Sequence, residues 1–170
     1  RVKVLVADAR YLPFDDAVFD AVIMESVNVF FEDKRQAMRA YMHVTKPGGY
    51  VGITEMTWLN PPTPEAVDYY RRTVFADALQ AEEWKALLED AGLRDVTGNA
   101  YAVDIPQEGK GRIQRYGCRG MLKVLWQTLK VFVKDPTSRD FLKDVTSSVP
   151  KDMLRDMGYG VYAGRKAEAS

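Results

Sequence analysis

The 170-residue sequence contains a single cysteine, Cys118, and a single histidine, His43. One cysteine cannot form an internal disulfide, and one cysteine with one histidine cannot build a tetrahedral zinc site. This scarcity favours a cytoplasmic, metal-free protein. No apolar stretch approaches the roughly 20 residues that cross a bilayer, so no transmembrane segment is predicted. His43 is expected at the surface of a helix.

Net charge is also lacking, because 24 basic residues balance 24 acidic ones. The bulk composition therefore gives no attraction to nucleic acid or to an anionic membrane, although a balanced total can hide a local patch. The hydrophobic content of 46% is enough for one sizeable core. A single domain is the expectation.

The first half of the sequence alternates strand and helix patterns. Val2–Ala7 alternates β-branched residues and is expected to form a strand, and Phe19–Met24 is an apolar run typical of a strand covered on both faces. Glu32–Asp33 opens a helix that stops at the turn Lys46–Gly49, and Tyr50–Met56 resumes as a strand. This order is typical of an open α/β sheet, whose ligands lie beyond the carboxyl ends of its strands.

The second half is predicted to add two helices and two strands before the chain ends. In chain order these are the helices Thr63–Ala76 and Ala81–Ala91 and the strands Leu93–Val103 and Tyr159–Gly164. The roughly 50 residues between the two strands far exceed the usual connection of a few residues. We interpret residues 105–156 as a helical insertion, made of helices over Arg112–Val133 and Pro136–Thr146 and a short turn over Asp152–Arg155.

Three motifs of the first half resemble those of class I S-adenosylmethionine-dependent methyltransferases of the small-molecule type. They are A-D-A-R-Y-L-P-F-D-D at Ala7–Asp16, F-D-A-V at Phe19–Val22 and T-K-P-G-G-Y at Thr45–Tyr50. Any one of them alone is weak, but the three stand in the family's order at the family's separations. The resemblance is dense from Val2 to about Met56 and continues more loosely to the terminal strands.

The resemblance implies a Rossmann-like open α/β sheet of strand order 3-2-1-4-5-7-6 with an antiparallel last strand. On that scheme Val2–Ala7 is the third strand, Asp20–Met24 the fourth and Tyr50–Met56 the fifth. The first two strands are absent, and with them the glycine-rich turn and the acidic residue that hold the cofactor's methionine and ribose parts. No glycine precedes Gly48. We therefore expect residues 1–170 to be a single carboxyl-terminal portion of a methyltransferase domain.

For the cofactor, the resemblance implies a site of which the adenine end is present. The Asp8 carboxylate would accept a hydrogen bond from the adenine amine, and the Ala9 amide would donate one to a ring nitrogen. The alternative for Asp8 is that it caps the following turn, as aspartate often does. Met24 and Glu25 would lie beside the sulfonium, and for Glu25 a solvated capping role is an equal alternative.

Glu55 and Trp58, at the end of the fifth strand and just past it, would face the acceptor pocket. The alternative for Trp58 is a core or rim aromatic. Methyl transfer from a sulfonium depends mostly on positioning and on exclusion of water, so the sequence names no catalytic residue. The resemblance thus implies methyl transfer from S-adenosylmethionine to a small-molecule acceptor in the parent protein, with this chain alone expected to be inactive.

The insertion carries a basic stretch, because residues 109–134 include no acidic side chain. On a continuous helix, six basic residues fall within roughly one third of the circumference. They are Arg112, Arg115, Arg119, Lys123, Lys130 and Lys134. The apolar side is expected to pack on the sheet domain, while Gly111, Gly117 and Gly120 suggest a bend at the front.

The basic stripe has one plain reading, a solvated face, and three functional ones: an anionic acceptor, an acidic partner and anionic lipid. No nucleic acid is expected, because few aromatic residues lie between the charges. The rival function is a non-catalytic α/β interaction module that uses the basic helix. A nicotinamide-dependent Rossmann enzyme is a third option, which the turn Lys46–Gly49 argues against.

The strands expected to be missing predict a further property of the chain. Without them, Val2–Ala7 has no family neighbour and the fourth strand has a bare edge, and such edges invite association. Two outcomes are open: Val2–Ala7 moves in beside the fourth strand, or two chains pair as a homodimer.

Overall fold

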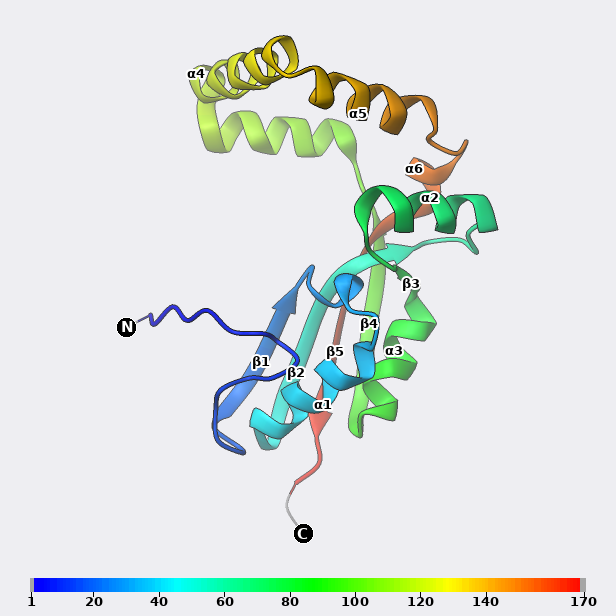
Figure 1. Cartoon of the computed structure of the whole chain (residues 1–170). Helices are drawn as coiled ribbons and strands as arrows, with labels where there is room; N and C mark the ends of the chain where they lie inside the picture. Colours follow the sequence, from blue (N-terminus) through cyan, green and yellow to red (C-terminus); the bar gives the residue numbers. More distant parts are fainter. Residues whose placement is uncertain (1, 169–170) are drawn as a thin grey trace.

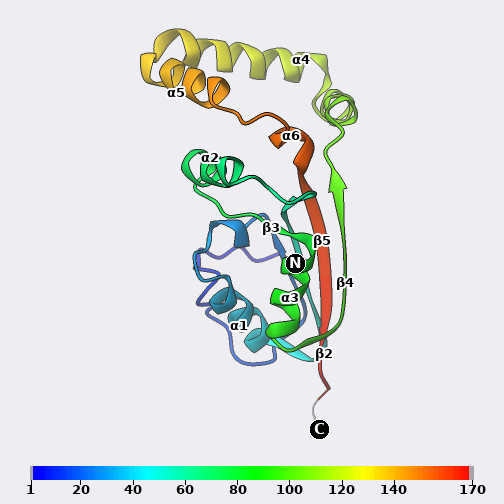
Figure 2. The same cartoon turned by 90° about the vertical axis from the view of Figure 1, so that its right-hand side faces the viewer.

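The computed structural model describes residues 2–168, with all side chains in that range except those of residues 105–109, 141–142, 144–147 and 154. These residues form one mixed sheet, with helices α1 and α3 on one of its faces and a helical hairpin that projects from one end (Figures 1 and 2). The α/β class predicted from the sequence is confirmed.

The sheet has the order β1-β2-β5-β4. Strand β1 (Phe19–Glu25) runs parallel to β2 (Thr45–Trp58), whereas β5 (Met157–Lys166) runs antiparallel to both β2 and β4 (Leu93–Ala102). A two-residue strand, β3 (Leu79–Gln80), pairs with the end of β2 and was not predicted. The order matches the fourth, fifth, seventh and sixth strands that the resemblance implied, with an antiparallel last strand.

The prediction of a strand at Val2–Ala7 is wrong. These residues belong to no strand, and Val2 and Val6 are fully open to solvent, at 90% and 104% exposure. An extended chain is stable as a strand only when a neighbour pairs with its N–H and C=O groups. Among the described residues the segment pairs with nothing, and Figure 1 shows it leading away from β1. It therefore does not take a place beside β1, and pairing of two chains stays a prediction.

Helix α1 (Lys34–Val44) confirms the helix expected after Glu32–Asp33. The Asp33 side chain accepts a hydrogen bond from the backbone N–H of Gln36 and so caps its first turn. The helix ends at the glycine turn, where the pairing of β1 with β2 jumps from Phe19–Thr45 to Ala21–Tyr50. Gly48 lies within this irregularity at a φ of +74°, which glycine adopts at little cost.

Helices α2 (Pro64–Val74) and α3 (Ala81–Asp90) also confirm their predictions. Thr63 caps α2 by accepting from the N–H of Ala66, and proline occupies the first turn. The core lies between the sheet and these helices. Its largest fully buried side chains include Trp84 of α3, Tyr41 of α1 and Tyr162 of β5.

Three helices lie between β4 and β5, in the stretch interpreted as a helical insertion. They are α4 (Ile105–Lys134), α5 (Pro136–Ser147) and α6 (Met153–Asp156). Helix α4 is interrupted at Gly117, whose φ of 67° and ψ of 166° are not helical. The bend suggested by the glycines is therefore confirmed, and the continuous six-residue stripe is wrong, because Arg112 and Arg115 precede the break.

We call α4 and α5 together the helical arm. Figures 1 and 2 show the arm extending beyond the end of the sheet that carries the carboxyl ends of β1 and β2. The expectation that its apolar side packs on the sheet domain is wrong: Leu125 is 66% exposed and Leu129 is 48% exposed. None of the described helices is both long enough and apolar enough to cross a membrane.

Candidate functional site

The candidate site begins with the loop Ser26–Phe31, which we call the β1 loop. Ser26 directly follows β1 and has a φ of +54°, an uncommon conformation for a residue with a side chain. Its N–H donates to the carbonyl of Thr54 at 2.8 Å, so the loop remains attached to β2 as it turns. The short 3-10 helix η1 (Asn28–Phe30) follows and was not predicted.

A buried carboxylate on β2 fixes the β1 loop in place. Oε1 of Glu55 accepts hydrogen bonds from the N–H groups of Val27 and Asn28, at 3.2 and 2.8 Å, and from Nδ2 of Asn28 at 2.7 Å. The hydroxyl of Tyr41 donates to Oδ1 of Asn28 at 2.9 Å. Glu55 and Asn28 are both 0% exposed. We call Asn28, Tyr41 and Glu55 the buried polar triad.

The other carboxylate oxygen of Glu55, Oε2, is buried and has no hydrogen-bond partner among the described residues. Burying a polar atom without a partner is costly, and the three hydrogen bonds that Oε1 accepts offset that cost. The nearby carboxylate also affects tyrosines. Burial first, and then Glu55, raises the pKa of Tyr70 to about 12 and holds the pKa of Tyr41 above its usual range.

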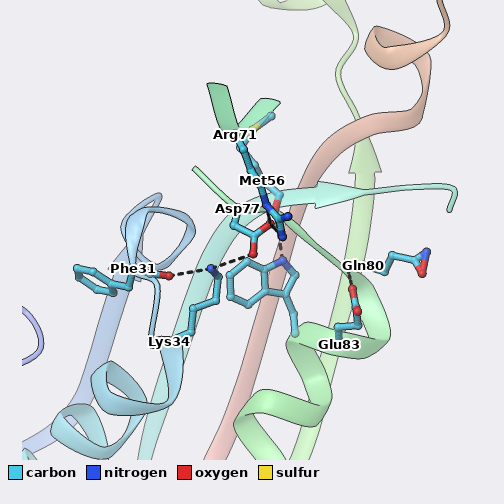
Figure 3. A network of polar contacts seen from close by, with 8 residues as sticks. Phe31, Lys34, Met56, Arg71, Asp77, Gln80 and Glu83 are labelled. Carbon is cyan, nitrogen blue, oxygen red and sulfur yellow. Dashed lines mark hydrogen bonds and ion pairs between the residues drawn. The ribbon is translucent and has the colours of Figure 1, made fainter. Parts of the chain in front are cut away.

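Lys34, the first residue of α1, also holds the β1 loop in place (Figure 3). Nζ of Lys34 donates to the carbonyl of Phe31 at 2.9 Å and lies 3.9 Å from Oδ2 of Asp77. The N–H of Asp77 in turn donates to the carbonyl of Val29 at 2.7 Å. Burial lowers the pKa of Lys34, and the carboxylate of Asp77 opposes that shift. The loop is thus held between a carboxylate on β2 and an ion pair of a buried lysine with a half-exposed aspartate.

Asp8 lies in an exposed turn beside this loop. Its carboxylate accepts from the N–H, Nε and Nη2 of Arg10, at 2.9, 3.0 and 2.7 Å. The hydrogen bond from the Arg10 side chain is the main cause that lowers the pKa of Asp8 to about 2. The Arg10 guanidinium lies over the ring of Phe31, 5.5 Å from its centre. The turn that contains Asp8 and Ala9 therefore meets the β1 loop.

The structure divides the predicted site residues into two groups. Asp8 and Glu25 are exposed, Glu25 at the carboxyl end of β1, and Ala9 and Met24 are half-buried against the core. By contrast, Glu55 and Trp58 are covered.

Trp58 is 3% exposed and meets the ring of Tyr70 edge-on, with 6.0 Å between ring centres. It occupies the core, which was the alternative given for it. Glu55 points into the buried polar triad, because it shares the inward face of β2 with Val51 and Ile53.

Sequence reasoning did not single out Asn28, Lys34 or Tyr41. One signal could have found the triad. Glu55 stands in phase with Val51 and Ile53 on a strand, and a carboxylate at such an inward position requires buried donors.

A shallow hollow lies next to this region, between the turn after Asp8 and the outer side of α1. It is lined by Arg10, Tyr11, Leu12, Gln36, Arg39, Ala40 and His43. No residue of the β1 loop lines it. His43 is exposed, as predicted, and faces Asp16 at 3.5 Å.

The exposed turn presents a hydrogen-bond acceptor next to a donor. The carboxylate of Asp8 is ionised down to low pH and supplies an acceptor, and the adjacent main-chain amide of Ala9 supplies a donor. An arriving ligand has to compete with Arg10 for that carboxylate. The donors and acceptors present thus fit the adenine end of the cofactor that the family implies.

Comparisons with known proteins agree with this fold. Residues 1–53 match a family model described as a methyltransferase domain. An uncharacterized protein of Haemophilus influenzae is 26% identical over 145 residues, which are 83% of this chain and 57% of that protein. The ubiquinone/menaquinone biosynthesis C-methyltransferase of Idiomarina loihiensis is 41% identical over 56 residues, or 33% of this chain and 22% of that enzyme. The chain thus spans 57% of the first of these relatives and 22% of the second.

A solved structure shows the same fold over nearly the whole chain. It is a phosphoethanolamine N-methyltransferase of Haemonchus contortus, in complex with phosphomonomethylethanolamine and S-adenosylhomocysteine. The TM-score is 0.69 at 17% identity, and the match covers 96% of this chain and 37% of that one. The motifs, the strand order and these likenesses together support the resemblance to class I S-adenosylmethionine-dependent methyltransferases.

Proposed function

We propose that the protein transfers the methyl group of S-adenosylmethionine to a small-molecule acceptor, and that this chain holds the adenine end of the cofactor. The observation that carries the proposal is the contact between the turn at Asp8–Ala9 and the β1 loop at the carboxyl ends of the parallel strands. Bound there, the cofactor would supply an activated methyl group. Met24 and Glu25 then lie on the side of the sulfonium.

The chain's own residues have two tasks in this proposal. Asp8 and Ala9 bind and orient the adenine, and the buried polar triad keeps the β1 loop from moving. Rigid support of this kind suits a displacement that depends on alignment rather than on an acid or base. Glu55 thereby becomes a positioning residue, which differs from the substrate contact expected from the sequence. For Trp58 we propose support of the acceptor side through its packing on Tyr70.

The acceptor class rests on the named relatives. One is named for the methylation of quinones at carbon, and the other was solved with a phosphorylated amine. Both acceptors are small molecules, and they share no chemistry that the described residues single out.

We further propose that residues 1–170 alone bind the cofactor weakly and are inactive, because their binding groups reach only the adenine. Calorimetric titration of S-adenosylhomocysteine into the chain tests this, with a millimolar or undetectable dissociation constant expected. Micromolar binding would contradict it.

The position of the adenine is tested by amide NMR shifts at millimolar S-adenosylhomocysteine. We expect the shifts to cluster at Asp8–Leu12 and in the β1 loop. The variant Asp8→Asn weakens them, because it removes the charged acceptor, whereas the matched variant Asp15→Asn at an exposed position leaves them unchanged. Shifts that cluster elsewhere, or that persist in Asp8→Asn, would sink the adenine assignment.

The second candidate function is a non-catalytic interaction module, favoured by the exposed helical arm. Its partner would be anionic and would bind the four basic residues that follow the break at Gly117. A homodimer through the bare edge of β1 and a cytoplasmic location also remain predictions.

A further inference from the structure

The part of α4 after the break, Cys118–Lys134, has two chemically distinct sides; we call it the amphipathic segment. At 100° per residue, its four basic side chains fall on an arc of about 60°. They are Arg119, Lys123, Lys130 and Lys134. Nearly all of the remaining circumference is apolar.

The apolar side of this segment is open to solvent. The segment's large apolar residues that are at least one third exposed are Leu122, Val124, Leu125, Trp126, Leu129, Val131, Phe132 and Val133. Both views show the arm held away from the sheet (Figures 1 and 2). Contiguous apolar surface of this kind on a protein marks an interaction site.

The charges on the amphipathic segment indicate which kind of partner binds its apolar side. Residues 109–134 contain no acidic side chain, so the whole surface has one sign. Trp126 stands at the border between the basic arc and the apolar side, and Nζ of Lys130 lies 5.3 Å from the centre of its ring. Around the helix, the basic residues are followed by the tryptophan at the border and then by leucine and valine. A lipid leaflet has the matching order of anionic headgroups, interface and acyl chains.

We propose that the amphipathic segment lies flat on an anionic lipid surface, with its apolar side among the acyl chains and its four basic residues at the phosphates. A helix in this position lies on the membrane and does not cross it, in keeping with the lack of a spanning helix among the described residues. The break at Gly117, where nothing crowds the glycine, lets the segment turn relative to the rest of the arm. Docking does not depend on the proposed methyl transfer.

A lipid surface fits these features better than a protein. A second copy packed through the same side would bring two basic stripes together at the rim, where like charges repel. An acidic protein would satisfy the charges and leave the wide apolar side in need of a matching groove. A lipid leaflet offers phosphates to the basic residues and acyl chains to the apolar side.

The first test is flotation of the 170-residue chain with vesicles. We expect binding to phosphatidylcholine vesicles that contain phosphatidylglycerol, weakening as salt is added, and little binding to phosphatidylcholine alone. Absence of binding to the anionic vesicles overturns the proposal. So does a dimer in light scattering that protects the segment and leaves vesicles unbound.

Trp126 supplies a direct readout of insertion. The other two tryptophans, Trp58 and Trp84, are 3% and 0% exposed in the sheet domain and are not expected to respond. We expect the fluorescence to shift to the blue on anionic vesicles, and the variant Trp126→Phe to lose the shift. Binding without any shift would mean charge attraction alone, and would overturn the insertion of the apolar side.

Matched variants separate the two sides of the segment. Lys123→Gln with Lys130→Gln is expected to weaken binding about 25-fold, at about fivefold for each charge. Leu125→Gln is expected to weaken it about tenfold. The control is Lys3→Gln with Lys151→Gln, two exposed lysines outside the arm, which should leave binding unchanged. Equal loss in the control variant overturns the assignment to this segment.

Discussion

The carboxyl-end region of β2 buries polar residues, whereas the helical arm exposes apolar ones. Near the end of β2, a carboxylate, an amide and a lysine are buried: Glu55, Asn28 and Lys34 are 0%, 0% and 7% exposed. On the arm, leucines, valines and a tryptophan are open to water. Residue type alone therefore does not decide burial in this protein.

The difference follows from what surrounds each element. Strand β2 has β1 on one side, β5 on the other and helices over one face, so even polar residues on that face are covered. The polar residues then persist because hydrogen bonds satisfy most of their atoms. The amphipathic segment projects past the sheet, where its apolar residues have no such cover. Buried polar groups here support the candidate site, and exposed apolar groups mark a docking surface.

The sharpest test of this comparison uses the same residue type in both regions. Trp84 is fully buried in α3 and its Nε1–H donates to the carbonyl of Met56 at 3.2 Å, whereas Trp126 is 58% exposed on the arm. We expect Trp84→Ala to lower the free energy of unfolding by about 3–5 kcal/mol, and Trp126→Ala to change it by less than about 0.5 kcal/mol. Urea unfolding followed by circular dichroism measures both.

A large loss of stability in Trp126→Ala would show that the arm packs on the sheet domain, against the structure. If Trp84→Ala does not fold, Trp84→Phe keeps most of the apolar contact and removes the hydrogen bond, at a cost of about 1–2 kcal/mol.

The buried polar triad gives the second largest effect. Glu55→Ala leaves the N–H groups of Val27 and Asn28 without their acceptor inside the protein, and we expect a loss of about 2–4 kcal/mol. Glu55→Gln keeps one acceptor oxygen and should cost less, about 1 kcal/mol. Thermal and urea unfolding of the two variants measures the difference. Equal losses would mean that the hydrogen bonds to Oε1 contribute little.

How much of the fold could be predicted from the sequence depends on whether the residues that decide a feature lie close together in the chain. The strand predicted at Tyr50–Met56 is confirmed as part of β2, whereas the alternation in Val2–Ala7 predicted a strand that does not exist. Both patterns are compatible with a strand, but a segment forms a strand only where a neighbouring strand pairs with it. Strand pairing is a property of the whole sheet, which a local pattern does not contain.

The residues of the candidate site likewise divide into those predicted from a local motif and those that depend on distant parts of the chain. Asp8 and Ala9 were predicted from an ordered motif, and the structure places them beside the β1 loop. Asn28 was not predicted, because its role arises from Glu55, 27 residues further along the chain. The bend at Gly117 was suggested by the glycines, yet the exposure of the arm depends on its position beyond the sheet and could not be read from an amphipathic pattern.

Alkaline pH should destabilise the buried region around Tyr70. Burial raises the pKa of Tyr70 to about 12, so the folded protein keeps this phenol neutral where an unfolded tyrosine ionises near pH 10. A raised pKa contributes stability that is complete below about pH 10 and is lost as the pH rises toward 12. We expect the unfolding midpoint to fall through this window, with Tyr70→Phe flattening the fall. Ultraviolet absorbance at the phenolate band reports ionisation, and a normal titration of Tyr70 would contradict its burial.

The smallest effect concerns the exposed ion pair of Asp8 and Arg10, and it contrasts with the buried polar triad. The Arg10 side chain lowers the pKa of Asp8 to about 2, so the stabilising contribution is present above the usual value near 3.8 and disappears as the pH falls toward 2. Arg10→Ala should return the pKa of Asp8 toward its usual value, seen by NMR of the side-chain carboxyl carbon, while stability at neutral pH barely changes because the pair is exposed. Arg39→Ala, which removes an exposed arginine that faces Asp33, serves as the control and should leave Asp8 unaffected. If the pKa of Asp8 stays low in Arg10→Ala, then Arg10 is not the cause, and the adenine would meet no competition from it.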